Sequence, residues 1–388
     1  MKSWQEALAQ RKALGLYRER HTVEGPQAAR LRVDGREYLN FCSNDYLGLA
    51  NHPRVVEALR EGALRYGAGS GASHLVTGHS RAHEELETAL AAYTGRERAL
   101  LFSTGYMANV GTIATLAAHG DSILQDRLNH ASLLDGATLS RAKLLRYTHA
   151  DATDAARRLE NIDGGMKLLV TDGVFSMDGD LAPLPQLAQA CQRHNACLMV
   201  DDAHGLGVLG ATGRGVCEHF NLSATDVPVL IGTLGKAFGT FGAFVAGSAT
   251  LINFVLQHAR SYIYTTALPP AVAHATLTSL QLIDTENWRR TKLHELITRF
   301  RRGAAELNLP MAASATPIQP LIVGESQRAL ALSAALRERG LWVAAIRPPT
   351  VPDGSARLRI TLSADHKPSD IDRLLQTLSE IIAHDAAR

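Results

Sequence analysis

The amino-acid sequence predicts an α/β protein with a mainly parallel, doubly wound central sheet. Short apolar runs alternate with helix-like segments through the middle of the chain, which is the pattern of consecutive βαβ units. Polar side chains follow five of these runs directly, where open α/β sheets bind their ligands. Beyond about residue 285 the pattern changes to long charged helices with a few strands, which predicts a second, smaller α+β domain.

The composition is that of an ordinary globular protein. The 388 residues are 46% hydrophobic and 20% charged, and the net charge of +2 argues against a dedicated nucleic-acid binder. No apolar run approaches the ~18 residues of a membrane span, and the N-terminal segment lacks the apolar core of a signal peptide. The four cysteines form no C-x-x-C pair. We therefore expect a cytoplasmic protein with reduced thiols and no bound metal.

Residues 1–44 are expected to form an N-terminal arm that contains one helix and one hairpin. The segment RLRVDGREYLNF alternates residue types around Asp34-Gly35, a turn pair that is typical of hairpins. A helix that Pro53 opens and Gly67 closes follows the arm. The Gly- and Ser-rich segment 67–80 is expected to be an ordered loop, because an amphipathic helix follows it at once.

Residues 45–285 are expected to form the large domain that holds the central sheet. Its strands are predicted at the apolar runs ALLF (99–102), SILQ (122–125), KLLVT (167–171), CLMV (197–200), VLI (229–231) and AFVAG (243–247). Residues 286–388 combine a long charged helix, several strands and a final helix, so they are expected to form the small C-terminal α+β domain.

Lys236, in the segment GTLGKAFG, differs from an ordinary surface lysine. No acidic residue lies within nine positions of it, and its glycine neighbours allow another group to approach closely. Apolar neighbours favour the uncharged amine, which is the form that makes a Schiff base with a carbonyl compound. The alternative interpretation is a lysine that extends into solvent from the end of a strand.

The other strand ends suit a phosphorylated aldehyde cofactor. Ser103 to Tyr106 precede a helix-like segment, and the N–H groups at a helix start bind anions. Asp201 follows the run 197–200 and suits a protonated pyridine nitrogen, which pyridoxal phosphate needs in order to act as an electron sink. The 35 positions from Asp201 to Lys236 leave room for one crossover between neighbouring strands. We therefore expect pyridoxal 5'-phosphate as the cofactor.

Two segments also resemble nucleotide-binding motifs, which compete with this interpretation. Gly205 to Gly210 match the G-x-G-x-x-G pattern of dinucleotide-binding folds and closely follow a predicted strand. Four polar or small residues intervene, however, and the glycine-rich run continues where a helix should begin. Gly232 to Lys236 faintly resemble a phosphate-binding loop, but the spacing is too short, and Ala237 stands where that motif needs Ser or Thr.

Several motifs together resemble the α-oxoamine synthases, a family of fold-type-I pyridoxal phosphate enzymes. These motifs are SNDYLGL, GAGSGASHLVTG, DDAHGLGVLGATGRG and GTLGKAFG, and the similarity extends over nearly the whole chain. Members of the family are acyltransferases that condense an amino acid with an acyl thioester and release CO₂. The resemblance therefore implies the fold-type-I architecture, this reaction type and the cofactor already expected from the residues.

The resemblance also assigns roles to matching residues in and around the cofactor site. Lys236 would carry the cofactor, Asp201 would pair with its pyridine nitrogen, His204 would contact its phenolic oxygen with help from Ser176, and His130 would stack on its ring. The implied catalytic residues are Lys236, Asp201, His204 and His130. The implied phosphate-binding residues are Gly105, Tyr106 and Thr233, together with Thr265 and Thr266 from a second subunit.

Further residues are implied for the substrates. Arg347 would bind the amino-acid carboxylate, while Asn44, Thr350 and His130 would contact substrate. Arg18 would bind the far end of the acyl chain, and Arg20 is almost as well placed for that role. The alternatives are that Arg347 pairs with an acid and that Arg18 is a surface charge of its helix.

Within the family, three segments are most like the enzyme of biotin synthesis that joins L-alanine to a pimeloyl thioester. They are SWQEAL, TDGVFSMDGD and AIRPPTVP. The acyl carrier, coenzyme A or a carrier protein, is left open. The alternatives are family members that make 2-amino-3-ketobutyrate or 5-aminolevulinate from glycine, and a non-catalytic binding protein on this fold. A homodimer with a shared active site is implied, with no nucleic-acid or membrane partner.

Overall fold

The computed structural model describes residues 3–386, which form two units. The larger unit consists of Asn51–Ser176 and Leu181–Asn287. The smaller unit joins the described residues up to Ala50, the short segment Met177–Asp180 and the described residues from Trp288 onward. The domain limits given above, 1–44, 45–285 and 286–388, stay predictions.

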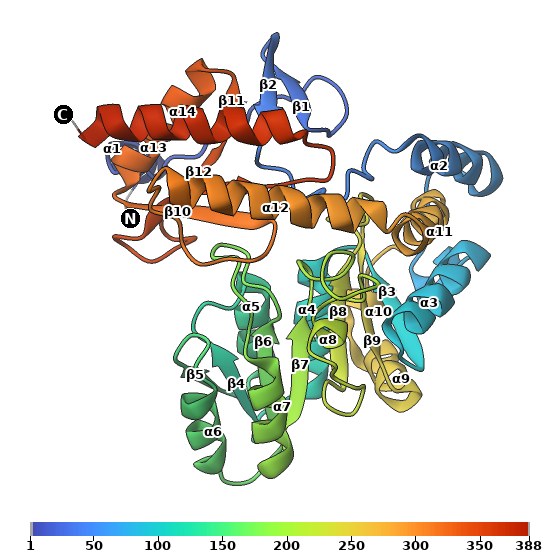
Figure 1. Ribbon diagram of the computed structural model, residues 1–388. Helices are drawn as coiled ribbons and strands as arrows, with labels where there is room; N and C mark the ends of the chain where they lie inside the picture. Colours follow the sequence, from blue (N-terminus) through green and yellow to red (C-terminus); the bar gives the residue numbers. More distant parts are fainter. Residues whose placement is uncertain (1–2, 387–388) are drawn as a thin grey trace. The chain divides into compact units, whose positions relative to one another are not determined.

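The larger unit is built on a seven-stranded sheet with the order β3-β9-β8-β7-β6-β4-β5 (Figure 1). All neighbours from β8 to β5 pair in parallel, whereas β9 runs antiparallel to both β8 and β3. This arrangement confirms the mainly parallel sheet. The strands are β3 (Arg98–Phe102), β4 (Ser122–Asp126), β5 (Lys143–Tyr147), β6 (Lys167–Asp172), β7 (Cys197–Asp201), β8 (Val229–Thr233) and β9 (Ala243–Gly247).

The central strands are buried on both faces, as parallel strands between two helical layers must be. Residues on one face, among them Leu168 and Val170, form a cluster with apolar side chains of helices α4, α5 and α9. Residues that alternate with them, such as Leu169 and Val200, are also fully buried. The sequence analysis did not predict β5. Its first two residues are exposed, so this edge strand lacks the continuous apolar run by which the others were found.

The helices of the larger unit begin and end near residues that the sequence marks. Pro53 opens α2 and Gly67 ends it, as predicted. The segment 67–80 is ordered, as predicted, and contains the π-helix η1 (His74–Gly78). The helices are α2 (Pro53–Tyr66), α3 (Arg81–Thr94), α4 (Gly105–Leu116), α5 (Ala131–Ser140), α6 (Ala152–Glu160), α7 (Leu184–Arg193), α8 (Val216–His219), α9 (Ala249–His258), α10 (Arg260–Ile263) and α11 (Pro270–Thr285).

The smaller unit contains two three-stranded sheets, with the orders β1-β2-β11 and β10-β13-β12. The predicted hairpin is present, and its turn residues Asp34 and Gly35 both have positive φ, which suits a two-residue turn. The elements are α1 (Trp4–Ala13), β1 (Arg30–Val33), β2 (Arg36–Asn40), α12 (Trp288–Glu306), β10 (Ile318–Gly324), α13 (Ser326–Glu338), β11 (Leu341–Trp342), β12 (Ala344–Ile346), β13 (Ala356–Thr361) and α14 (Pro368–Ala386). Among the described residues, no helix is both long and apolar enough to cross a membrane.

A buried acid on α3 makes the stability of the larger unit depend on pH. Burial raises the pKa of Glu87 from 4.5 to about 8, even though its carboxylate accepts the N–H of Leu101 at 2.8 Å. The pKa of Glu87 is higher in the folded protein than in the unfolded one. Its contribution to the free energy of unfolding is therefore fully present below pH 4.5. This contribution is lost as the pH rises toward 8.

Replacing this acid by its neutral isostere is therefore expected to stabilise the protein at high pH. Glu87→Gln keeps an oxygen for Leu101 and stays uncharged, so the variant should gain on the order of a few kcal/mol over the parent at pH 9. Thermal unfolding at pH 5, 7 and 9 measures the gain, which should shrink toward zero at pH 5. Glu85→Gln, on the exposed face of α3, is the control and should show no such trend. Equal trends for both variants would contradict the prediction.

Candidate active site

The polar residues predicted at strand ends lie together at one edge of the sheet in the larger unit. Strands β3, β4, β6, β7 and β8 share one direction, so their carboxyl ends meet at the same edge. Lys236 follows β8, and its Nζ lies 3.0 Å from Nε2 of His204, which follows β7. The two strands are parallel neighbours, as the 35-position spacing predicted. The lysine is partly buried and directed at another site residue.

Asp201 lies at the end of β7 and is held by two donors. Its side chain is 5% exposed, and its Oδ2 accepts a hydrogen bond of 2.6 Å from Nδ2 of Asn109 on α4. Its Oδ1 accepts the N–H of Ala203 at 3.0 Å. The Asn109 amide also donates to Ser132 Oγ at 2.9 Å, and this oxygen lies 2.7 Å from Nδ1 of His130. One hydrogen-bonded chain therefore connects the carboxylate to the predicted ring-stacking histidine.

His130 caps the start of α5 and is placed by an acid at the end of β6. Its backbone N–H donates to Oδ2 of Asp172 at 2.7 Å. Desolvation by the surrounding protein lowers the pKa of the His130 ring, and the nearby carboxylate of Asp201 opposes this effect. Burial, together with the charge of Asp201, raises the pKa of Asp172 well above its usual value. Because its own pKa is lowered, the His130 ring is neutral at pH 7, so it can donate a hydrogen bond without carrying a positive charge.

The residues after Asp201 explain the glycine-rich segment without a nucleotide. Asp202 is completely buried, and its Oδ2 accepts the N–H of Val216 at 2.8 Å. A Cβ at Gly205 would lie 2.1 Å from Oδ1 of Asp202, and one at Gly215 would lie 1.8 Å from its Oδ2. Glycine is needed there to let the backbone wrap around a carboxyl group. No helix starts until Val216, so the dinucleotide-binding alternative is wrong.

The predicted anion site lies at the start of α4. Thr104 is its N-cap residue and accepts the N–H of Met107 at 3.2 Å. Gly105 and Tyr106 lie in the first turn, where N–H groups have no carbonyl partner within the helix. The Tyr106 hydroxyl donates to Asp135. Thr233, at the end of β8, donates its hydroxyl to the carbonyl of Gly242 at 3.2 Å.

The predicted residues at 265–266 belong to a segment that pairs with the loop before η1. Thr266 is exposed and forms an isolated antiparallel bridge with Ser73. The N–H of Ala267 donates to the carbonyl of Ala72 at 3.0 Å. Ser176 is partly buried and ends the stretch of the larger unit that continues from β6. The role of the threonines across a subunit boundary stays a prediction.

Four of the predicted substrate residues, Arg18, Asn44, Arg347 and Thr350, lie in the smaller unit, whereas His130 belongs to the larger one. Nη2 of Arg18 donates to the Thr350 hydroxyl at 3.1 Å, so two of the predicted residues are in contact. Arg347 donates to backbone carbonyls of the N-terminal arm, at Gly15 and, over 3.4 Å, at Tyr17. Burial and the charge of Arg18 lower the pKa of Arg347.

Sequence reasoning missed Arg359 on β13. Its two terminal nitrogens each lie 3.2 Å from Oδ1 of Asn44, which is one of the predicted substrate residues. The side chain is 7% exposed, so a buried cation stands beside the predicted substrate position. The alternation Arg357-Leu358-Arg359 on a strand was the available signal, because neither arginine has an acidic residue next to it in the sequence.

The donor set of the larger unit fits pyridoxal phosphate group by group. Lys236 would supply the amine for the aldehyde, Asp201 a fixed carboxylate, and the first turn of α4 the N–H groups for a phosphate. Fold and site together define the class: this is a pyridoxal-phosphate-dependent enzyme with the fold-type-I architecture.

Comparisons with known proteins identify the family to which the chain belongs. Residues 36–378 match the family aminotransferase class I and II, and the chain belongs to that family. It is 59% identical to the 8-amino-7-oxononanoate synthase of Cellvibrio japonicus (strain Ueda107), over 98% of this chain and 96% of the relative. This similarity supports the resemblance to the α-oxoamine synthases.

Solved structures agree with this placement. A high-resolution structure of SPT with PLP is 30% identical, covers 97% of both chains and has a TM-score of 0.93. The crystal structure of 8-amino-7-oxononanoate synthase from Francisella tularensis is 32% identical, with a TM-score of 0.79. It covers 90% of this chain and 99% of that one. The fold-type-I assignment is confirmed.

Proposed function

We propose that the chain condenses L-alanine with a pimeloyl thioester to form 8-amino-7-oxononanoate, CO₂ and the thiol of the acyl carrier, in biotin biosynthesis. The observation that carries the chemistry is the contact of Lys236 with His204, next to the strand end that bears Asp201. The full-length similarity to an 8-amino-7-oxononanoate synthase supports the choice of substrates. The glycine-dependent reactions of the same family are the less favoured alternative.

The cofactor supplies an electron sink when it is bound, and the protein's residues arrange the rest. Asp201 would hold a proton on the pyridine nitrogen, since a buried carboxylate with two donors favours a cationic partner. The network through Asn109 keeps this carboxylate in place. The N–H groups at the start of α4 and the hydroxyl of Thr233 would bind the phosphate.

Lys236 is the residue that moves a proton at the Cα of alanine. With the cofactor and alanine bound, the free amine of Lys236 would be the base for that proton, and the same group would return a proton to Cα after CO₂ has left. His204 lies 3.0 Å from Nζ and orients the amine. His130 donates a hydrogen bond to the thioester oxygen as negative charge develops there.

The smaller unit supplies the groups for the substrate carboxylates. Arg347 binds the carboxylate of alanine, and Arg359, beside Asn44, is a second cation suited to that role. Arg18, in contact with Thr350, binds the terminal carboxylate of the pimeloyl chain. A homodimer completes the site through Thr265 and Thr266 of a second subunit, and the reaction takes place in the cytoplasm.

A panel of acyl thioesters tests the proposal. The holoenzyme is given alanine or glycine with acetyl, succinyl, octanoyl and pimeloyl thioesters, and released CO₂ and the amino ketone are both measured. Alanine with the pimeloyl thioester should give the largest kcat/KM. A faster reaction of glycine with the acetyl or succinyl thioester would replace the proposed substrates by those of another family member.

Arg18→Ala is expected to weaken binding of the acyl substrate selectively. A carboxylate–guanidinium contact in a partly desolvated pocket is worth about 1.5–3 kcal/mol, so the KM for the pimeloyl thioester should rise about 10- to 150-fold. The KM for alanine should stay unchanged, and an acyl chain without the terminal carboxylate should not respond to the substitution. Arg20→Ala is the matched control on the same exposed stretch. A selective effect of Arg20→Ala instead would move the contact to that residue.

Hybrid dimers test the shared site. Lys236→Ala subunits lack the amine, and Thr266→Arg subunits carry a bulky charge at the exposed bridge partner of Ser73. If each site uses residues of both chains, mixed dimers contain one site with neither defect and should regain up to about half of the parent activity per dimer. Purified hybrids with differently tagged subunits are assayed. Hybrids as inactive as both parents would rule out the shared site.

A further inference from the structure

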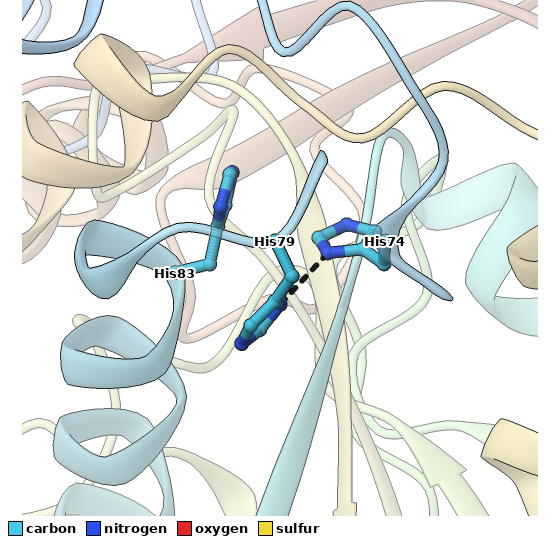
Figure 2. Close-up of side chains that lie close together, drawn as sticks. All are labelled: His74, His79 and His83. Atoms are coloured by element: carbon cyan, nitrogen blue, oxygen red, sulfur yellow. Dashed lines mark hydrogen bonds between the residues drawn. The ribbon is translucent and has the colours of Figure 1, made fainter. Parts of the chain in front are cut away.

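Three histidines of the larger unit lie together outside the site described above. His74 begins η1, His79 directly follows it, and His83 lies in the first turn of α3. Their ring centroids are 5.0 to 5.5 Å apart, and Figure 2 shows His79 reaching toward His74. One nitrogen of each ring lies within 4.8 Å of the others. The expectation of no bound metal was based on the cysteine pattern and not on the spacing of these histidines.

The outer nitrogens of two rings are already engaged, as they are in metal-binding histidines. Nε2 of His83 lies 2.7 Å from the carbonyl oxygen of Leu268, to which it donates. Nε2 of His79 lies 3.2 Å from Oε2 of Glu84 and donates a hydrogen bond to this carboxylate. The remaining nitrogen of each of these rings, Nδ1, therefore carries a lone pair. A ligating histidine in proteins is oriented by this kind of partner on its far side.

One nitrogen of each ring lies within reach of one small cation. Nδ1 of His74 and Nδ1 of His79 share a hydrogen bond of 3.0 Å, in which His74 donates because Nε2 of His79 donates to Glu84. A tetrahedral zinc ion with bonds of about 2.0–2.1 Å separates its ligand nitrogens by about 3.3 Å, so the ion would replace the shared proton, which His74 would release. Nδ1 of His83 accepts the N–H of Ser80 at 3.0 Å, and a metal ion would displace that contact.

We propose that His74, His79 and His83 bind one divalent transition-metal ion, with Zn²⁺ as the expected ion. Three imidazole ligands suit zinc, copper or nickel, whereas magnesium and calcium need oxygen ligands. The site joins η1 to α3, and His83 extends it to Leu268. The bound ion therefore fixes the segment that carries Thr265 and Thr266, and this role is independent of the proposed reaction.

Metal titration of the holoenzyme tests the site. After treatment with a chelator and its removal, the protein should take up one equivalent of Zn²⁺ per chain by calorimetry. Co²⁺ should bind in its place and give the visible absorption of a tetrahedral nitrogen-ligated ion, a readout that needs no variant. The same titration should raise the unfolding temperature of the holoenzyme. Lack of uptake by the unsubstituted protein would overturn the proposal.

Three variants locate the bound ion. His79→Gln should abolish the first equivalent, and Glu84→Gln should weaken it about 10- to 100-fold, because Glu84 orients the ligand without binding the metal. His119→Gln, an exposed histidine elsewhere on the larger unit, is the control and should bind as the parent does. A first equivalent that survives in His79→Gln would place the ion elsewhere and overturn the assignment.

Discussion

Lys236→Ala is expected to abolish the condensation, with kcat reduced by more than about 10⁴-fold, which is the upper range for loss of a proton-transfer group alone. The loss should exceed that range because the same amine also carries the cofactor. Its neighbour His204, at 3.0 Å, cannot form a stable Schiff base and therefore cannot substitute for it. Turnover is measured as CO₂ release from labelled alanine with pimeloyl thioester.

Chemical labelling gives this prediction a second, independent readout. Borohydride reduction of the parent holoenzyme should fix the cofactor on a single peptide, the one that contains Lys236, and should label Lys236→Ala nowhere. Lys143→Ala, an exposed lysine on β5, is the control and should keep both activity and label. Label on any other lysine of the parent would show that the catalytic amine has been assigned wrongly.

The sequence predicted the main features of the sheet because its central strands are apolar throughout. A parallel strand buried on both faces leaves a continuous apolar run, as in KLLVT, and the polar residue after the run marks the strand end. Lys236 and Asp201 were found in this way. The edge strand β5 was not predicted, because exposed positions at Lys143 and Leu144 interrupt its apolar pattern.

The groups that support the site were not predictable from local patterns. Asn109 lies in the middle of a helix 92 positions before Asp201, and only the packing of α4 against the sheet brings its amide to the carboxylate. Arg359 meets Asn44 across 315 positions. Sequence motifs identify residues that follow strands, whereas contacts between distant elements depend on how the helices pack.

The network around Asp201 leads to the second large effect. Asp201→Asn is expected to lower kcat about 10²- to 10³-fold, the range for removing one preorganised electrostatic partner from an active site. The amide has the shape of the carboxylate but no negative charge, so a protonated pyridine nitrogen loses its partner. The new amide can turn either its NH₂ group or its carbonyl group toward Asn109. Only the carbonyl group can accept the 2.6 Å hydrogen bond that Asn109 donates in the parent.

The adjacent Asp202 provides the matched control for this charge effect. Burial raises the pKa of Asp202 well above its usual value, which favours the uncharged carboxyl group that Asp202→Asn imitates. Asp202→Asn should keep kcat within a few-fold of the parent. In Asp201→Asn the cofactor should stay attached to Lys236 under borohydride while kcat falls, which separates the loss of charge from loss of cofactor. Equal losses of kcat in the two variants would mean that the charge of Asp201 has no special part in the reaction.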